Sequence, residues 1–236
     1  MAVITDTVGL RKIGIAGRHC GATVALVDPE LTLGLPASVT AATGMDALTH
    51  AIEAYVSNIA SVPSDIFALK AIGLIYQSLE AAYSNGNHLA ARSNMLLGSL
   101  LAGMAFSIAK LGLVHAIAHP LSVHCGLAHG VANACTLPYV MEYNAQEERV
   151  KQRNQEIAEA MGLDVKGQSA ADASAKAIQA VRRLSESIRI PTLEQAGVKR
   201  EQFVQIAVDA MNEISIPTNP RSVTQEDVMR LLELAY

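Results

Sequence analysis

From residue 36 onward, apolar side chains recur every three or four positions, which is the spacing of one face of a helix. The pattern predicts a first helix that is capped by Thr40 or Thr43 and runs through Tyr55. Further helices are predicted at residues 63–83, 88–109, 129–144, 148–162, 171–188, 200–213 and 225–235. The segment 88–109 is apolar nearly all round, so we expect it to be central, with Gly98 and Gly103 permitting close helix approach.

The residues before this helical region carry short β-like runs: VIT (3–5), KIGI (12–15) and TVALV (23–27). Parallel strands need a crossover of a dozen or more residues, but only seven separate Ile15 from Thr23. The runs therefore form a small hairpin or belong to a sheet whose other strands are missing. Gly14, Gly17 and Gly21 do not make a GxGxxG phosphate loop. The chain is predicted to be mainly α, a multi-helix domain preceded by a few short β-strands.

Composition narrows the class of protein. The 236 residues suit one large domain or one and a half, and half of them are hydrophobic. A net charge of −4 without a Lys/Arg block argues against nucleic acid as a partner. The longest nearly apolar run, 95–109, is shorter than the roughly 20 residues of a membrane span, so we expect a buried core helix and no membrane partner.

Cysteines and the N-terminus bear on the compartment. The three cysteines, Cys20, Cys125 and Cys135, are an odd number without CxxC spacing, which favours a reducing environment over a disulfide framework. No charged region followed by an apolar stretch begins the chain, so no signal peptide is expected. We predict a cytoplasmic protein.

Candidate chemistry gathers in two stretches. Residues 112–144 hold four of the seven histidines: His115, His119, His124 and His129. Residues 44–53 place Asp46 and His50 four positions apart, so that a carboxylate and an imidazole share one helix face. Within 112–144, Pro120 predicts a kink and Gly126 predicts the end of the helical segment. One oxygen ligand and several nitrogen ligands indicate a divalent transition-metal site.

Each part of this pattern also has an ordinary structural interpretation. A single histidine on an apolar helix is more often a hydrogen-bonded core residue, and the Asp46–His50 pair alone is typical of a helix-surface contact. Four histidines within one otherwise apolar run are harder to explain in that way. Burying several imidazoles without partners would cost about 1–3 kcal/mol each. We therefore favour a metal site.

These stretches also carry a resemblance. GMDALTHAIEAYVS (44–57) and GLVHAIAHPLSVHCGLAHGVANACTLPYVMEYN (112–144) resemble motifs of the iron-containing (group III) alcohol dehydrogenases. The likeness runs from Val3 to the C-terminus, through VALVDPELTLGLP (24–36) and NPR (219–221). Family members usually have glycines before the NPR, whereas this chain has IPT, so the loop is expected to lie differently.

The resemblance implies roles for particular residues. The metal ligands would be Asp46, His50, His115 and His129. His119 matches the histidine near the nicotinamide and substrate, where it would relay a proton; the alternative is a structural histidine beside the site. His124 matches no ligand and is interpreted either as a residue that supports the ligands or as merely structural. Lys12 matches a lysine near the cofactor; the alternative is an exposed lysine at a strand end.

The resemblance further implies a reaction and a division into domains. Three neutral imidazoles and one carboxylate suit Fe(II), or Zn(II), as a Lewis acid, and the hydride carrier would be NAD or NADP. Residues 1–36 would be a remnant of an α/β nucleotide-binding domain and residues 37–236 a helical metal-binding domain, so the chain alone is expected to bind NAD(P) poorly. The substrate would be a small alcohol or aldehyde, and we expect a homo-oligomer. The alternatives are a metal-dependent lyase or cyclase resembling dehydroquinate synthase, and a non-catalytic helical module stabilised by metal.

Overall fold

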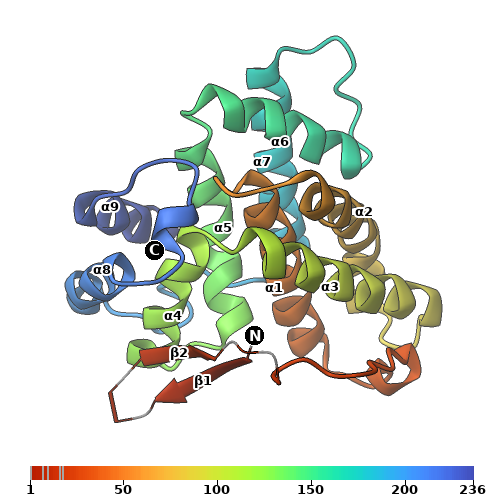
Figure 1. The fold of residues 1–236 in the computed structure, drawn as a ribbon, viewed down its shortest axis with the longest axis horizontal. Coiled ribbons are helices and arrows are strands. Elements are labelled where there is room, and N and C mark those ends of the chain that lie inside the picture. Colours follow the sequence, from red (N-terminus) through yellow and green to blue (C-terminus); the bar gives the residue numbers. More distant parts are fainter. Residues whose placement is uncertain (1, 7, 10, 16, 18) are drawn as a thin grey trace.

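The fold is mainly α, as predicted (Figure 1). The computed structural model describes residues 2–6, 8–9, 11–15, 17 and 19–236. Its helices are α1 (Ala37–Val56), α2 (Val62–Ser84), α3 (Leu89–Ala109), α4 (Leu113–Cys125), α5 (His129–Asn144), α6 (Glu148–Ala160), α7 (Ala170–Ser187), α8 (Phe203–Met211) and α9 (Gln225–Ala235). Short 3-10 turns lie at Pro29–Thr32, Arg200–Gln202 and Ile216–Thr218. The predicted helix boundaries agree with these to within a few residues, except at the start of α1. The helical segment that was predicted to end at Gly126 is α4, which begins at Leu113.

The N-terminal residues form one antiparallel hairpin. Strand β1 (Ala2–Asp6) pairs with β2 (Arg11–Ile15), with Ala2 opposite Ile15 and Asp6 opposite Arg11. The hairpin lies beside α4, and β2 contacts that helix. The prediction of a strand at 23–27 is wrong, because this segment is irregular and has no strand to pair with in the described chain. Its apolar side chains are solvent-exposed, with Leu26 93% accessible.

Helix α1 occupies the centre of the molecule, where it contacts α2, α3, α5 and α6. It begins directly after Pro36, so the predicted caps, Thr40 and Thr43, are wrong. Both threonines lie inside the helix, where their hydroxyls form hydrogen bonds that do not cap the helix N-terminus. Thr40 Oγ1 accepts a hydrogen bond from Arg92, and Thr43 Oγ1 donates to the carbonyl of Val39.

Helix α3 is not central, contrary to the prediction. Its apolar outer stripe is partly exposed and comprises Leu97, Leu100, Met104 and Ile108. By length and composition α3 qualifies as a membrane span, and no other helix in the described chain does; core helices of soluble proteins meet the same criterion. The inner side packs on α1 and α2. Gly98 does permit close approach, since a Cβ there would lie 2.6 Å from Ile75, whereas Gly103 faces open space.

Helix α4 ends at Gly126, as predicted, and carries Pro120 within it; a kink at Pro120 stays a prediction. Gly126 has a left-handed backbone with φ of 67°, a conformation that glycine adopts without strain. After this turn the chain continues to α5, which begins at His129. The two histidine-bearing helices are therefore joined by a short connection and pack against each other.

Helix α5 approaches α1 so closely that Gly130 is required at the contact. A Cβ on Gly130 would lie 2.2 Å from the carbonyl oxygen of Ala42. We expect Gly130→Ala to lower the free energy of unfolding by about 1–3 kcal/mol, because the helices must move apart. Urea unfolding followed by circular dichroism measures this change.

Gly103→Ala is the matched control for Gly130→Ala. Apart from its chain neighbours and the adjacent backbone of its own helix, no atom of the described chain lies within 4 Å of a Cβ at Gly103, in the middle of α3. Alanine there should stabilise the protein by about 0.5–1 kcal/mol, since it restricts the unfolded chain. Equal unfolding free energies for the two variants would contradict the close α1–α5 contact.

Candidate metal centre

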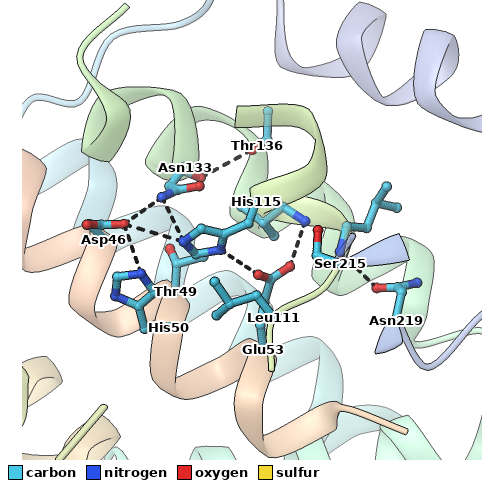
Figure 2. Close-up of polar contacts among 12 residues, drawn as sticks. Asp46, Thr49, His50, Glu53, Leu111, His115, Asn133, Thr136, Ser215 and Asn219 are labelled. Atoms are coloured by element: carbon cyan, nitrogen blue, oxygen red, sulfur yellow. Dashed lines mark hydrogen bonds and ion pairs between the residues drawn. The ribbon is translucent and has the colours of Figure 1, made fainter. Parts of the chain in front are cut away.

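Three helices bring a carboxylate and three imidazoles together. Asp46 and His50 come from α1, His115 from α4 and His129 from α5. Figure 2 shows Asp46, His50 and His115. Asp46 Oδ1 lies 3.7 Å from His50 Nε2, 3.7 Å from His115 Nε2 and 3.6 Å from His129 Nε2. Ligand atoms of Asp46, His50 and His115 all lie within 4.8 Å of one another. The residues that the resemblance implies as ligands are thus neighbours in space.

These separations fit a divalent ion. Metal–nitrogen and metal–oxygen bonds near 2.1 Å place tetrahedral ligand atoms about 3.4 Å apart. The three Asp46–imidazole distances exceed that value by only a few tenths of an ångström. A mixed nitrogen and oxygen donor set suits Fe(II) or Zn(II) better than Mg(II) or Ca(II), which prefer oxygen alone. The cluster can therefore hold a transition-metal ion with small side-chain movements.

A buried carboxylate fixes the orientation of His115. Glu53 is only 4% exposed, and its Oε2 lies 2.6 Å from His115 Nδ1. Its Oε1 accepts the backbone N–H of Val114 at 2.6 Å. With Nδ1 bound to Glu53, His115 presents Nε2 to Asp46, an arrangement in which a carboxylate orients a metal-binding histidine. Sequence reasoning missed this role, although Glu53 follows Asp46 and His50 on the same face of α1.

Asn219, from the NPR motif, holds the same end of α4. Its Oδ1 accepts the backbone N–H of Leu113 at 3.2 Å. Its amide also exchanges two hydrogen bonds with Asn144, at the end of α5. A Cβ on Gly112 would lie 3.0 Å from Asn219 Oδ1 and 3.1 Å from Glu53 Oε1. Glycine at this position lets both side chains reach the first turn of α4.

Asn133 is a second residue that the sequence did not indicate. It is fully buried, one turn after His129 on α5. Its Nδ2 donates to Asp46 Oδ1 at 2.6 Å and lies 3.3 Å from His115 Nε2 and 3.2 Å from His129 Nε2. The amide therefore contacts three of the four candidate ligands, and its position four residues from His129 was the available signal.

Burial and neighbouring charges shift the pKa values of the clustered side chains in different directions. Burial alone would raise the pKa of Asp46, but the three imidazoles around it hold that pKa well below its usual range. Burial lowers the pKa of His50 to about 4 and that of His129 to about 3. Burial opposes protonation of His115 too, yet the carboxylates of Asp46 and Glu53 raise its pKa to about 9. Near neutral pH, His115 therefore holds a proton that a cation must displace.

The remaining predicted residues lie outside the cluster. His119 lies beside it, with ring centroids 5.3 Å from His129 and 6.1 Å from His115. His124 pairs with Asp209 at 2.5 Å, in agreement with a structural role. Lys12 lies on β2, the strand that contacts α4. Its place near a cofactor stays a prediction.

The fold and the cluster together define a class, a helical domain with a candidate transition-metal centre at its core. Known proteins of this class match the chain. A model described as the Fe-containing alcohol dehydrogenase family, C-terminal, covers residues 40–236. The chain belongs to the iron-containing alcohol dehydrogenase family.

Individual relatives are longer than this chain. The 1,3-propanediol dehydrogenase of Klebsiella pneumoniae is 44% identical over 237 residues, 99% of this chain and 60% of that protein. The NAD-dependent methanol dehydrogenase of Bacillus methanolicus is 39% identical over 238 residues, 100% of this chain and 61% of that protein. The solved structure of a 1,3-propanediol oxidoreductase matches with a TM-score of 0.86 at 45% identity, covering 89% of this chain and 55% of that one. The chain thus spans about 60% of the length of the curated relatives it matches.

Metal affinity should depend on pH through His115. Between the pKa of His50, about 4, and that of His115, about 9, one proton must leave for each ion bound. Affinity should therefore rise about tenfold per pH unit in this range and level off above it.

In Glu53→Gln, one carboxylate is lost, so the pKa of His115 falls and the plateau of metal affinity begins at lower pH. Plateau affinity should fall about 10- to 100-fold, because His115 loses its orienting partner.

Zinc titrations across pH, followed by calorimetry, measure both effects. Glu142→Gln is a suitable control, since Glu142 pairs with Arg182 on the surface, away from the cluster. It should leave the pH profile unchanged. Identical profiles for the wild type and Glu53→Gln would refute the role assigned to Glu53.

Proposed function

We propose that this chain carries the metal-binding part of the active site of an NAD(P)-dependent alcohol dehydrogenase. Asp46, His50, His115 and His129 are the proposed ligands of Fe(II), or of Zn(II). The convergence of three imidazole nitrogens on one Asp46 oxygen is the observation that carries the proposal. The substrate is proposed to be a small alcohol or aldehyde, the class named for the propanediol and methanol dehydrogenases that it resembles.

The proposed reaction balances with one hydride and one proton. The alcohol carbon gives a hydride to the nicotinamide ring, and the alcohol oxygen gives up its proton as the carbonyl forms. A divalent ion bound by the ligands would act as a Lewis acid towards that oxygen. His119, beside the cluster, is the proposed proton acceptor, a role suited to imidazole near neutral pH. Reduction of an aldehyde reverses both transfers.

The surroundings of Asp46 favour this reaction over the lyase alternative. Asp46 forms its ion pairs with histidines, rather than with Lys or Arg, in the described chain. The ring of His50 stacks on Phe106 of α3, with centroids 4.7 Å apart. A site for a highly charged substrate would instead need several cationic side chains. These contacts suit a small, weakly polar molecule.

We propose further that residues 37–236 form the metal-binding domain and that residues 1–36 belong to a nucleotide-binding domain, with Lys12 near the cofactor. In the described part of 1–36 the backbone forms a hairpin and a 3-10 turn, and no helix follows a glycine-rich turn there. Such a helix N-terminus is the usual pyrophosphate site. These 236 residues alone should therefore bind NAD(P) weakly. A homo-oligomer and a cytoplasmic location also stay predictions.

Removing a ligand should remove the metal. We expect His115→Ala and His129→Ala each to lose most bound metal, since each substitution removes one of the four proposed donor atoms. Elemental analysis of protein purified in defined metal gives the stoichiometry, and His124→Ala, outside the cluster, should keep it. Zn(II) is expected to outcompete Fe(II) when both are present. Unchanged stoichiometry in both ligand variants would disprove the assignment.

Substitution of His119 should affect turnover rather than metal content, unlike substitution of a ligand. In a preparation that oxidises alcohol, His119→Ala should keep its metal but lose about 10²–10⁴-fold in kcat, the usual contribution of a proton relay. Steady-state kinetics together with metal analysis provide the measurement. If the variant retains full activity with an unaltered pH profile, His119 is structural.

A further inference from the structure

Two histidine–carboxylate pairs connect α4 with α8 and the residues just after α8. His119 and His124 lie on α4, and their partners, Glu213 and Asp209, lie just beyond and within α8. His119 Nδ1 lies 3.0 Å from Glu213 Oε2, and both side chains are mostly buried, at 14% and 15% exposure. His124 uses its other nitrogen, Nε2, for Asp209, which is more exposed at 34%. The two pairs therefore differ in which imidazole nitrogen they engage.

The nitrogen engaged decides the tautomer. A neutral imidazole has one N–H donor and one nitrogen acceptor, and an ionised carboxylate only accepts hydrogen bonds. The contact with Glu213 therefore requires the proton of His119 on Nδ1, which leaves the lone pair on Nε2. The ring of His119 stacks on that of His129 and meets that of His115 edge-on. The acceptor nitrogen thus belongs to the ring that borders the candidate metal centre.

The backbone around Glu213 is also held in place. Its N–H donates to the carbonyl of Ala210 at 3.1 Å, and its own carbonyl accepts from the N–H of Ile216 at 3.2 Å. The α4–α8 packing does not depend on this pair alone. Phe203, Ile206 and Ala207 of α8 are fully buried, and the His124–Asp209 pair links the same helices. Packing of α8 against α4 therefore does not require the Glu213 carboxylate.

We propose that Glu213 is a positioning residue that fixes His119 as the Nδ1–H tautomer, with Nε2 kept as the proton acceptor for the alcohol. The acceptor role rests on the proposed function, whereas the tautomer does not. When the alcohol proton moves to Nε2, the ring becomes a cation whose charge lies next to the Glu213 carboxylate. The pair thereby stabilises the charge that develops during oxidation.

The tautomer can be measured without enzyme activity. The 236-residue chain, loaded with zinc and labelled with 15N at histidine, gives long-range 1H–15N correlations that distinguish protonated from unprotonated ring nitrogens. In alkaline buffer, His119 should show a protonated Nδ1 and an unprotonated Nε2. In Glu213→Gln, the amide can donate or accept, so both tautomers should appear. Glu213→Asp should partly restore the wild-type spectrum.

Asp209→Asn is the matched control, because it neutralises the carboxylate of the other pair, between α4 and α8. It should leave the tautomer of His119 unchanged. A wild-type His119 that carries its proton on Nε2 overturns the inference. So does an identical His119 tautomer in Glu213→Gln, or the same change in Asp209→Asn, which would show an effect of helix packing.

Kinetics give a second, separate readout. In a preparation that oxidises alcohol, Glu213→Gln should lower kcat about 10- to 100-fold with little change in KM, as expected when an orienting partner of a histidine is lost. Asp209→Asn should change neither constant. Unchanged kcat in Glu213→Gln would overturn the catalytic part of the inference. If the tautomer results hold but no preparation that contains this chain oxidises alcohol, the tautomer assignment stands, whereas the proposed function and the acceptor role of His119 fail.

Discussion

The Glu53 carboxylate is the contact on which the candidate site most depends. It is buried between α1 and α4, where an unpaired charge would be strongly unfavourable. The N–H of Val114 and Nδ1 of His115 both bond to it, and the positive end of the α4 dipole lies beside it. One side chain therefore satisfies the start of α4 and orients a candidate ligand. Any change that displaced α4 from α1 would also leave this carboxylate without partners.

The site is built on helices rather than on loops. Asp46, His50 and Glu53 follow one another at helical spacing on α1, a helix most of whose residues are buried. Helices α4 and α5 meet this face, and Gly130 allows α5 to approach within backbone contact. Rigid elements hold ligand atoms to within a few tenths of an ångström more reliably than mobile loops do. This placement explains how ligand atoms converge from three separate elements.

Electrostatics divide the histidines into groups with different tasks. Burial keeps His50 and His129 neutral, with lone pairs available, while two carboxylates keep a proton on His115. His119 and His124 each pair with one carboxylate, Glu213 and Asp209 respectively. Histidines that look alike in the sequence are thus distinguished by the carboxylates around them, as expected when a site must hold both an ion and a mobile proton.

The sequence by itself determined the helices, because apolar spacing is a local property, and it placed Asp46 and His50 together, because residues four apart share a helix face. The set of four ligand candidates came from the resemblance of the two motifs to those of a known family. It could not determine which faces are covered: α3 is apolar all round yet partly exposed, and 23–27 is β-like yet irregular. The tertiary structure decided the partners of the histidines. Glu53 lies 62 positions from His115, Asn133 lies 87 from Asp46 and Glu213 lies 94 from His119. Such contacts depend on how whole helices pack, and no periodicity along the chain encodes them.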